Sequence, residues 1–188
     1  KDKIADYKIA IYAPIYNFNK RFFSDSKDVV VRSYGDKNSV LCDEIDLKVI
    51  YVYSPDVRQT LLGIASKVGM SLETVRRRIK ELEKKKVIVG YKIDMNLPLL
   101  GYQGYRVDFA LNSIARNDEL FNYIKHHKYF YQINKPIGGA DFETEIVVKD
   151  LSHLSNILEE ISSKFKDVIK NYEYVGYTEF PKLSIVSD

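Results

Sequence analysis

A concentration of cationic side chains marks the middle of the sequence. Between Lys67 and Lys92, nine residues are basic and three are acidic, which is a net charge of +6 over 26 residues. A field of this sign attracts a polyanion. A solvated, lysine-rich helix face has the same composition, so charge alone leaves both interpretations open.

The spacing within this stretch predicts a helix with two different sides. Ser71 is a natural N-cap for a helix that runs to about Lys86. At about 100° per residue, Val75, Ile79 and Leu82 fall on one side and are expected to face a core. The opposite side collects polar and charged residues, namely Glu73, Thr74, Arg77, Lys80, Glu81 and Lys84, with Arg76 and Arg78 at its borders.

Two shorter helices are expected to position this one. Asp43 can cap a helix over residues 44–53, and Thr60 can cap a second over residues 61–68. Gly69 follows where a helix C-terminus favours a left-handed residue. The pattern predicts three consecutive helices, the last two joined by a tight turn.

The junction of the last two helices has the punctuation of a helix-turn-helix. Ala65 is small enough for two helices to cross closely, and Gly69 tolerates the positive φ of a tight turn. Val75 points back into the shared core. This signature favours binding of double-stranded DNA over a merely solvated helix face.

The N-terminal part of the second helix in such a motif usually reaches base edges in the major groove. Arginine suits the O6/N7 edge of guanine, and glutamate can accept from cytosine N4. The residues predicted to contact bases are Glu73, Thr74 and Arg77. Those predicted to bind phosphates, which position without specifying, are Arg76, Arg78, Lys80 and Lys84. Ser71 completes the candidate DNA-binding site. After it, residues 87–89 and 91–94 predict a two-stranded wing.

A run of short motifs carries a family resemblance. It opens with Asp43-Glu44-Ile45-Asp46-Leu47-Lys48 and continues with Ile64-Ala65, Val68-Gly69, Ser71, Thr74-Val75, Arg77-Arg78-Ile79, Leu82-Glu83, Val87-Ile88, Gly90-Tyr91 and Leu100-Gly101. Together these residues resemble the Lrp/AsnC family, the feast/famine transcription regulators of bacteria and archaea. The resemblance implies a winged helix-turn-helix domain at 43–94, a linker at 95–101 and a dimerisation and effector-sensing domain at 102–188.

The second half of the chain predicts the order strand, helix, strand, strand, helix, strand. The expected elements are 105–111, 118–126 capped by Asn117, 129–134, 142–148, 151–165 capped by Asp150, and 172–180. This βαββαβ order is the ferredoxin-like arrangement, an antiparallel sheet with two helices on one face. The expected fold class is therefore α+β, with a winged helix-turn-helix followed by a ferredoxin-like domain.

The ferredoxin-like domain is expected to provide two contacts. An apolar sheet face that no helix covers would have to be hidden, which predicts a homodimer or a higher homo-oligomer. The resemblance implies that a small effector, often an amino acid, binds between subunits at the turn that contains Gly138, Gly139 and Asp141. The alternative is that the two glycines simply form a tight hairpin.

Residues 1–42 lie outside the resemblance. The segments 7–13 and 29–32 are weak strand candidates, with Pro14 expected to end the first. Two explanations stay open. Either the chain continues upstream with another copy of the module, or these residues form a small hairpin packed on the DNA-binding domain.

Several classes of function are disfavoured by composition. No apolar run approaches the roughly 18–20 residues of a membrane span. The single Cys42 and three histidines match no zinc pattern, so we expect no metal, no cofactor and a reducing, cytoplasmic location. We predict a non-enzymatic, sequence-specific transcription regulator modulated by a small effector such as an amino acid. The alternatives are a siroheme decarboxylase-like enzyme of the same architecture and an amino-acid-sensing module without DNA binding.

Overall fold

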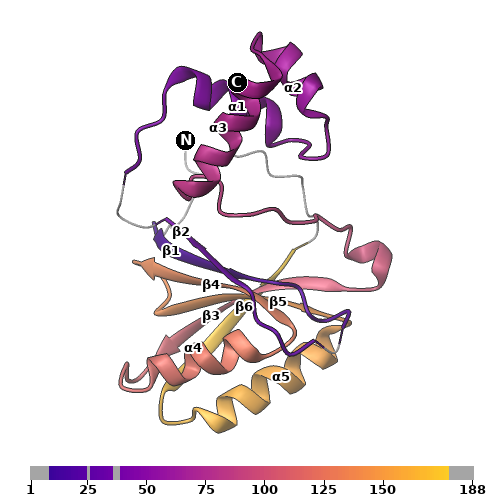
Figure 1. Cartoon of the computed structure of the whole chain (residues 1–188). Coiled ribbons are helices and arrows are strands. Elements are labelled where there is room, and N and C mark those ends of the chain that lie inside the picture. The colour runs from indigo at the N-terminus through magenta and orange to yellow at the C-terminus, as the bar shows by residue number, and fades with distance from the viewer. Residues whose placement is uncertain (1–8, 25, 36–38, 178–188) are drawn as a thin grey trace, which may run out of the picture. The chain divides into compact units, whose positions relative to one another are not determined.

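The computed structural model describes residues 9–24, 26–35 and 39–177, which fall in two compact units (Figure 1). A helical unit consists of residues 39–94, and a sheet unit combines the described residues before position 36 with those from Met95 onward. The helical unit is therefore inserted into the chain of the sheet unit. Residues 95–101, expected to be a linker, belong to the sheet unit and contain the short 3-10 helix Pro98–Leu100.

The helical unit contains three helices, and each begins at the predicted cap. They are α1 (Glu44–Tyr53), α2 (Leu61–Val68) and α3 (Leu72–Lys84). The side chains of Asp43, Thr60 and Ser71 each accept a backbone N–H of the first turn. Gly69 ends α2 in the left-handed conformation at φ 71°, as its position predicts. Helix α3 ends two residues before the expected Lys86.

The core of the helical unit consists of the apolar residues that the helical spacing selected. Val49, Ile64, Ala65, Val75, Ile79 and Leu82 are buried together. Because α3 contributes three of these residues from one side, its rotation about its own axis is determined by packing. The other side of α3 is directed away from this core.

The predicted two-stranded wing does not form. All of residues 87–94 are described, and none of them lies in a strand. The backbone N–H groups of Val87 and Ile88 instead both donate to the carbonyl of Leu82, and the two side chains pack against the helical core. A short, isolated two-stranded hairpin is at best marginally stable, so burial of these apolar side chains prevails over strand pairing.

The sheet unit is built on one antiparallel sheet in the order β2-β1-β4-β5-β3-β6. The strands are β1 (Ile11–Phe18), β2 (Val31–Tyr34), β3 (Gln103–Leu111), β4 (Phe130–Ile137), β5 (Phe142–Val148) and β6 (Ile169–Gly176). Helix α4 (Asn117–His126) follows β3, and α5 (Leu151–Lys164) follows β5. From β3 onward this is the predicted βαββαβ order, which confirms the fold class.

Helices α4 and α5 cover one face of this sheet (Figure 1). Leu120 and Ile124 from α4 and Leu154 from α5 are fully buried against strand residues such as Phe109 and Ile146. Asn117 is not the cap that the sequence suggested: Arg116 occupies the N-cap position, and Asn117 is the first helical residue. Strand β6 begins at Ile169, earlier than expected, and the predicted end at 178–180 lies outside the described residues.

The opposite face of the sheet is polar at its centre, which corrects the expectation of an apolar face that needs a partner. Glu143, on β5, is only 4% exposed and accepts a hydrogen bond from Asn134 of β4. Gln132 donates to Glu145 at 2.9 Å. The apolar Val147 is covered within the same chain by Phe22 and Leu97. Alternation along β5 places Glu143 and Glu145 opposite the helix-covered core, and a register shift in β4 between Phe130 and Gln132 brings Gln132 to the same face.

The described part of the N-terminal segment forms part of this sheet and belongs to the sheet unit. Strand β1 pairs antiparallel with β4, and β2 pairs with β1. Pro14 does not end the strand. It lies inside β1, between Tyr12 and Ile15, where the register with β4 shifts. A bulge is one of the few places where a strand tolerates proline.

Candidate nucleic-acid interface

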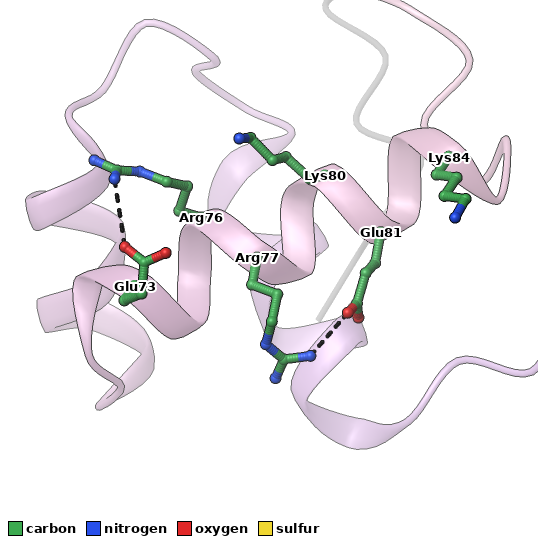
Figure 2. A pocket seen from close by; sticks show the side chains of 6 residues that line it. All are labelled: Glu73, Arg76, Arg77, Lys80, Glu81 and Lys84. Atoms are coloured by element: carbon green, nitrogen blue, oxygen red, sulfur yellow. Dashed lines mark hydrogen bonds and ion pairs between the residues drawn. The ribbon is translucent and has the colours of Figure 1, made fainter.

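Helix α3 presents its cationic side chains on the side opposite its core contacts. The outer side forms a shallow hollow, and Figure 2 shows the side chains that line it. They are Glu73, Arg76, Arg77, Lys80, Glu81 and Lys84. Four cations and two carboxylates give this surface a net charge of +2. The structure thus groups five of the residues predicted to contact DNA, and it adds Glu81, which the sequence prediction left out of the site.

Two of the arginines on this surface are held by carboxylates of the same helix (Figure 2). The Nη1 of Arg77 lies 2.8 Å from Oε1 of Glu81, one turn further along α3. The Nη1 of Arg76 lies 3.3 Å from Oε2 of Glu73. Both pairs are well exposed, so each is worth at most about 1 kcal/mol in water. An incoming phosphate or base can therefore compete for either arginine.

The two lysines of the surface remain available to an anion. Within the described chain, no hydrogen bond or ion pair engages the ammonium group of Lys80 or Lys84, and both residues are exposed. Lysine side chains of this kind suit phosphate groups because the ammonium acts as a mobile point charge.

Ser71 and Thr74 form the start of α3. The Oγ of Ser71 accepts the backbone N–H of Thr74 at 3.1 Å, and the two hydroxyls lie 2.9 Å apart. The role that the structure gives Ser71 is therefore that of a cap. Capping fixes the N-terminal turn, which is the part of such a helix that approaches base edges.

Arg78 is placed differently from the prediction. Its Nη1 donates to Asp43 at 2.6 Å and to Asp46 at 3.1 Å, and its side chain is only 18% exposed. Asp43 and Asp46 form a capping box at the start of α1. The backbone N–H of Asp46, and then Arg78, hold the pKa of Asp43 below its usual value. Arg78 therefore ties α3 to α1, and the phosphate contact predicted for it stays a prediction.

The sequence contained a signal for this internal role. Asp43-Glu44-Ile45-Asp46 has acidic residues at the two positions of a capping box. A buried carboxylate at the second position requires a cationic partner. The helical projection placed Arg78 at the border of the outer face, where it could serve either purpose.

The turn predicted to bind an effector has structural roles for each of its three named residues. Gly138 and Gly139 have φ values of 85° and 82°, which favour glycine. A Cβ at Gly138 would lie 2.8 Å from the carbonyl oxygen of Ile9, so the N-terminal segment passes directly over the turn. The carboxylate of Asp141 accepts the backbone N–H of Leu111 at 2.8 Å. These contacts agree with the hairpin alternative.

The described residues contain no cluster of three or more side chains suited to hold a metal ion. None of the helices in the described part of the chain is long and apolar enough to cross a membrane. Neither finding assigns a function.

Comparison with known proteins defines the class of the helical unit. The family model described as winged helix-turn-helix DNA-binding matches residues 43–89. This range begins at the cap of α1 and includes α3 with its cationic surface.

Relatives with functional names extend the match into the sheet unit. The Bkd operon transcriptional regulator of Pseudomonas aeruginosa is 31% identical over 116 residues, which are 58% of this chain and 74% of the relative. The transcriptional regulator LrpA of Pyrococcus horikoshii is 28% identical over 130 residues, 69% of this chain and 92% of the relative. The chain belongs to the Lrp/AsnC family of helix-turn-helix transcriptional regulators, as its motifs predicted.

Solved structures share the fold. AsnC of Escherichia coli superposes with a TM-score of 0.68 at 18% identity, covering 78% of this chain and 99% of AsnC. A transcriptional regulator of Neisseria meningitidis, solved as a complex with L-Met, has a TM-score of 0.67 at 14% identity and covers 77% of this chain and 95% of its own. About a fifth of this chain thus has no counterpart in AsnC, a share about as long as residues 1–42.

Proposed function

We propose that the outer face of α3 binds the major groove of duplex DNA and that this binding makes the protein a sequence-specific, non-enzymatic regulator of transcription. One observation carries the proposal. Val75, Ile79 and Leu82 are buried while the exposed cations of α3 project from the opposite side. A helix held in this way offers its charges to a groove and keeps its apolar side in the protein core.

The proposed roles follow the geometry. Arg77, in the middle of the outer face, contacts a base, and Glu73 and Thr74 in the first turns assist it. Arg76, Lys80 and Lys84 contact phosphates. Ser71 fixes the start of the helix, and Arg78 holds α3 on α1.

We infer that two copies bind together. Two equivalent recognition helices enter successive major grooves when their half-sites are about 34–36 Å apart, or a multiple of this distance. A pseudo-palindromic site and a homodimer are therefore expected. The open face of the sheet is polar at its centre and gives no support to a dimer. Family membership and the paired-helix geometry support it.

Regulation by a small molecule is the second part of the proposal. Support comes from the Neisseria meningitidis regulator of the same fold, which was solved with L-Met. An amino acid is thus the effector class to test first. Its binding at Gly138, Gly139 and Asp141 stays a prediction, since these residues also have the structural roles described above. The cytoplasmic location stays a prediction as well.

The test is recovery of DNA from a genomic library by the purified protein, followed by sequencing, with and without candidate amino acids. The proposal expects enrichment of sites that contain two related half-sites. Absence of any bound DNA at low salt would contradict it, because the electrostatic contribution is strongest there. A porphyrin-like absorbance band on purification would instead favour the decarboxylase alternative, although the named relatives are regulators.

A further inference from the structure

We propose that Glu81 is a positioning residue that sets how strictly Arg77 discriminates between bases. The inference rests on the proposed function, since it concerns the same surface of α3. Glu81 is the only acidic partner of Arg77 among the described residues. In this proposal its ion pair serves base recognition rather than helix stability. A DNA phosphate would be repelled by Glu81, because both groups carry negative charge.

Arg77 is the residue of α3 whose side-chain orientation matters most for the proposed base contact. At about 100° per residue, it lies opposite the direction of Val75 and Ile79, which are buried. Its side chain is 55% exposed, so solvent alone would leave the long side chain in many rotamers. A contact that removes some of these rotamers before DNA arrives lowers the ordering cost of one bound geometry.

Glu81 supplies such a contact without using all of the guanidinium. The contact joins one nitrogen of Arg77, Nη1, to one carboxylate oxygen of Glu81 at 2.8 Å (Figure 2). A guanidinium has five N–H donors in a planar fork. Donors therefore remain for the O6 and N7 atoms of guanine while the contact with Glu81 is kept.

The carboxylate also disfavours a wrong partner. Without Glu81, Arg77 could turn to any nearby phosphate and add affinity that carries no sequence information. With Glu81 in place, a phosphate must displace or approach a negative charge, whereas a guanine edge offers two acceptors to the held fork. Discrimination thus comes partly from a repulsive element, as is common in specific interfaces.

The experiment uses the full chain and two duplexes: one selected by the wild-type protein from a random pool, and one scrambled. Glu81→Ala is expected to bind the scrambled duplex roughly three- to tenfold more tightly, with a salt slope steeper by about one unit, because Arg77 gains a phosphate. Preference at one base pair of the selected duplex should fall by about fivefold or more. Glu81→Gln, which keeps an acceptor oxygen, should fall between wild type and Glu81→Ala.

The control for general charge is Glu159→Gln. Glu159 is an exposed residue on α5, and its substitution should change the affinity for neither duplex. The decisive comparison repeats Glu81→Ala in an Arg77→Ala background, where it should no longer alter preference at that base pair. The inference is overturned if Glu81→Ala strengthens both duplexes equally, or if its effect on base preference persists without Arg77. Failure of the wild type to bind any duplex would instead overturn the proposed function itself.

Discussion

Helix α3 and the N-terminal segment use arginine in opposite ways. On α3, Arg77 is more than half exposed and faces outward. In the N-terminal segment, Arg21 is 3% exposed and donates to the backbone carbonyls of Lys125 and His127, at the end of α4, at 2.8 and 3.3 Å. The difference shows that arginine content alone does not indicate a binding surface. What matters is whether the backbone carbonyls of a helix end or the solvent lie within reach of the guanidinium.

The same contrast separates two regions of the chain. The family model matches residues 43–89, within the helical unit, while β1 and β2 lengthen the sheet at the edge of β4. Phe18 from β1 joins the main core, and Phe22 covers Val147. The N-terminal segment therefore contributes to the stability of the sheet unit, and the proposed function assigns recognition to α3. Substitutions and a deletion in the two regions should separate the two roles.

The largest effect is expected from removing residues 1–42. This deletion removes the buried Phe18 and Phe22, each worth roughly 1.5–3 kcal/mol, and leaves the edge of β4 unpaired. We expect the free energy of unfolding of the sheet unit to fall by several kcal/mol, measured by thermal or denaturant unfolding. DNA binding by the folded fraction should persist. An unchanged unfolding midpoint would mean that the segment does not support the sheet.

A single substitution within the same segment should have a smaller effect. Arg21→Ala leaves the carbonyls of Lys125 and His127 without their charged donor, which should cost about 1.5–3 kcal/mol of unfolding free energy. Lys166→Ala, at an exposed position, is the control and should change stability by less than about 0.5 kcal/mol. Equal effects of the two substitutions would show that the buried guanidinium stabilises nothing.

Arg78 tests the boundary between stability and recognition within α3. Arg78→Ala leaves Asp46 buried without its cation, and we expect a loss of about 1–3 kcal/mol in the helical unit. The salt dependence of DNA binding should stay as in the wild type, once binding is corrected for the folded fraction. If the slope falls by one unit without loss of stability, Arg78 binds phosphate as the sequence first suggested.

In contrast to Arg78, Lys84 is expected to affect DNA binding and not stability. Lys84→Ala should leave stability within about 0.5 kcal/mol of the wild type, because the side chain is exposed and unpaired within the described chain. It should weaken binding to all duplexes alike and flatten the salt slope by about one unit. A change confined to one base pair would contradict the phosphate role.

The helical unit could be predicted closely because its signals are local. Asp43, Thr60, Ser71 and Gly69 each act within one helical turn, and the core residues of α3 follow a single period. The prediction of a two-stranded wing was wrong because Val87 and Ile88 pack against the helical core instead of joining a strand pair. The sequence also predicted most of the residues that share the outer face of α3, and their roles in DNA binding stay predictions. It did not predict the ion pairs of Arg78 and Glu81, because these depend on which rotamers meet.

The pairing of the N-terminal strands could not be predicted from local sequence signals. Strand β1 pairs with β4, more than a hundred residues away, and only that partner decides that Pro14 lies in a bulge and not at a strand end. Whether a segment forms a strand depends more on the strands and side chains that it packs against than on its own residue types. The carbonyls that Arg21 contacts likewise belong to a distant helix end. Local patterns thus indicated that this segment contains strands, but not where these strands lie in the sheet.

The most direct measurement of the central claim is the affinity of Arg77→Ala for the duplex that the wild type selects, compared with its affinity for variants at each base pair. If Arg77 on the outer face of α3 reads a base, the substitution should cost about 1–3 kcal/mol of binding free energy and remove the preference at one base pair. Retention of full affinity and of every base preference by a folded Arg77→Ala protein would show that DNA is not read by this face.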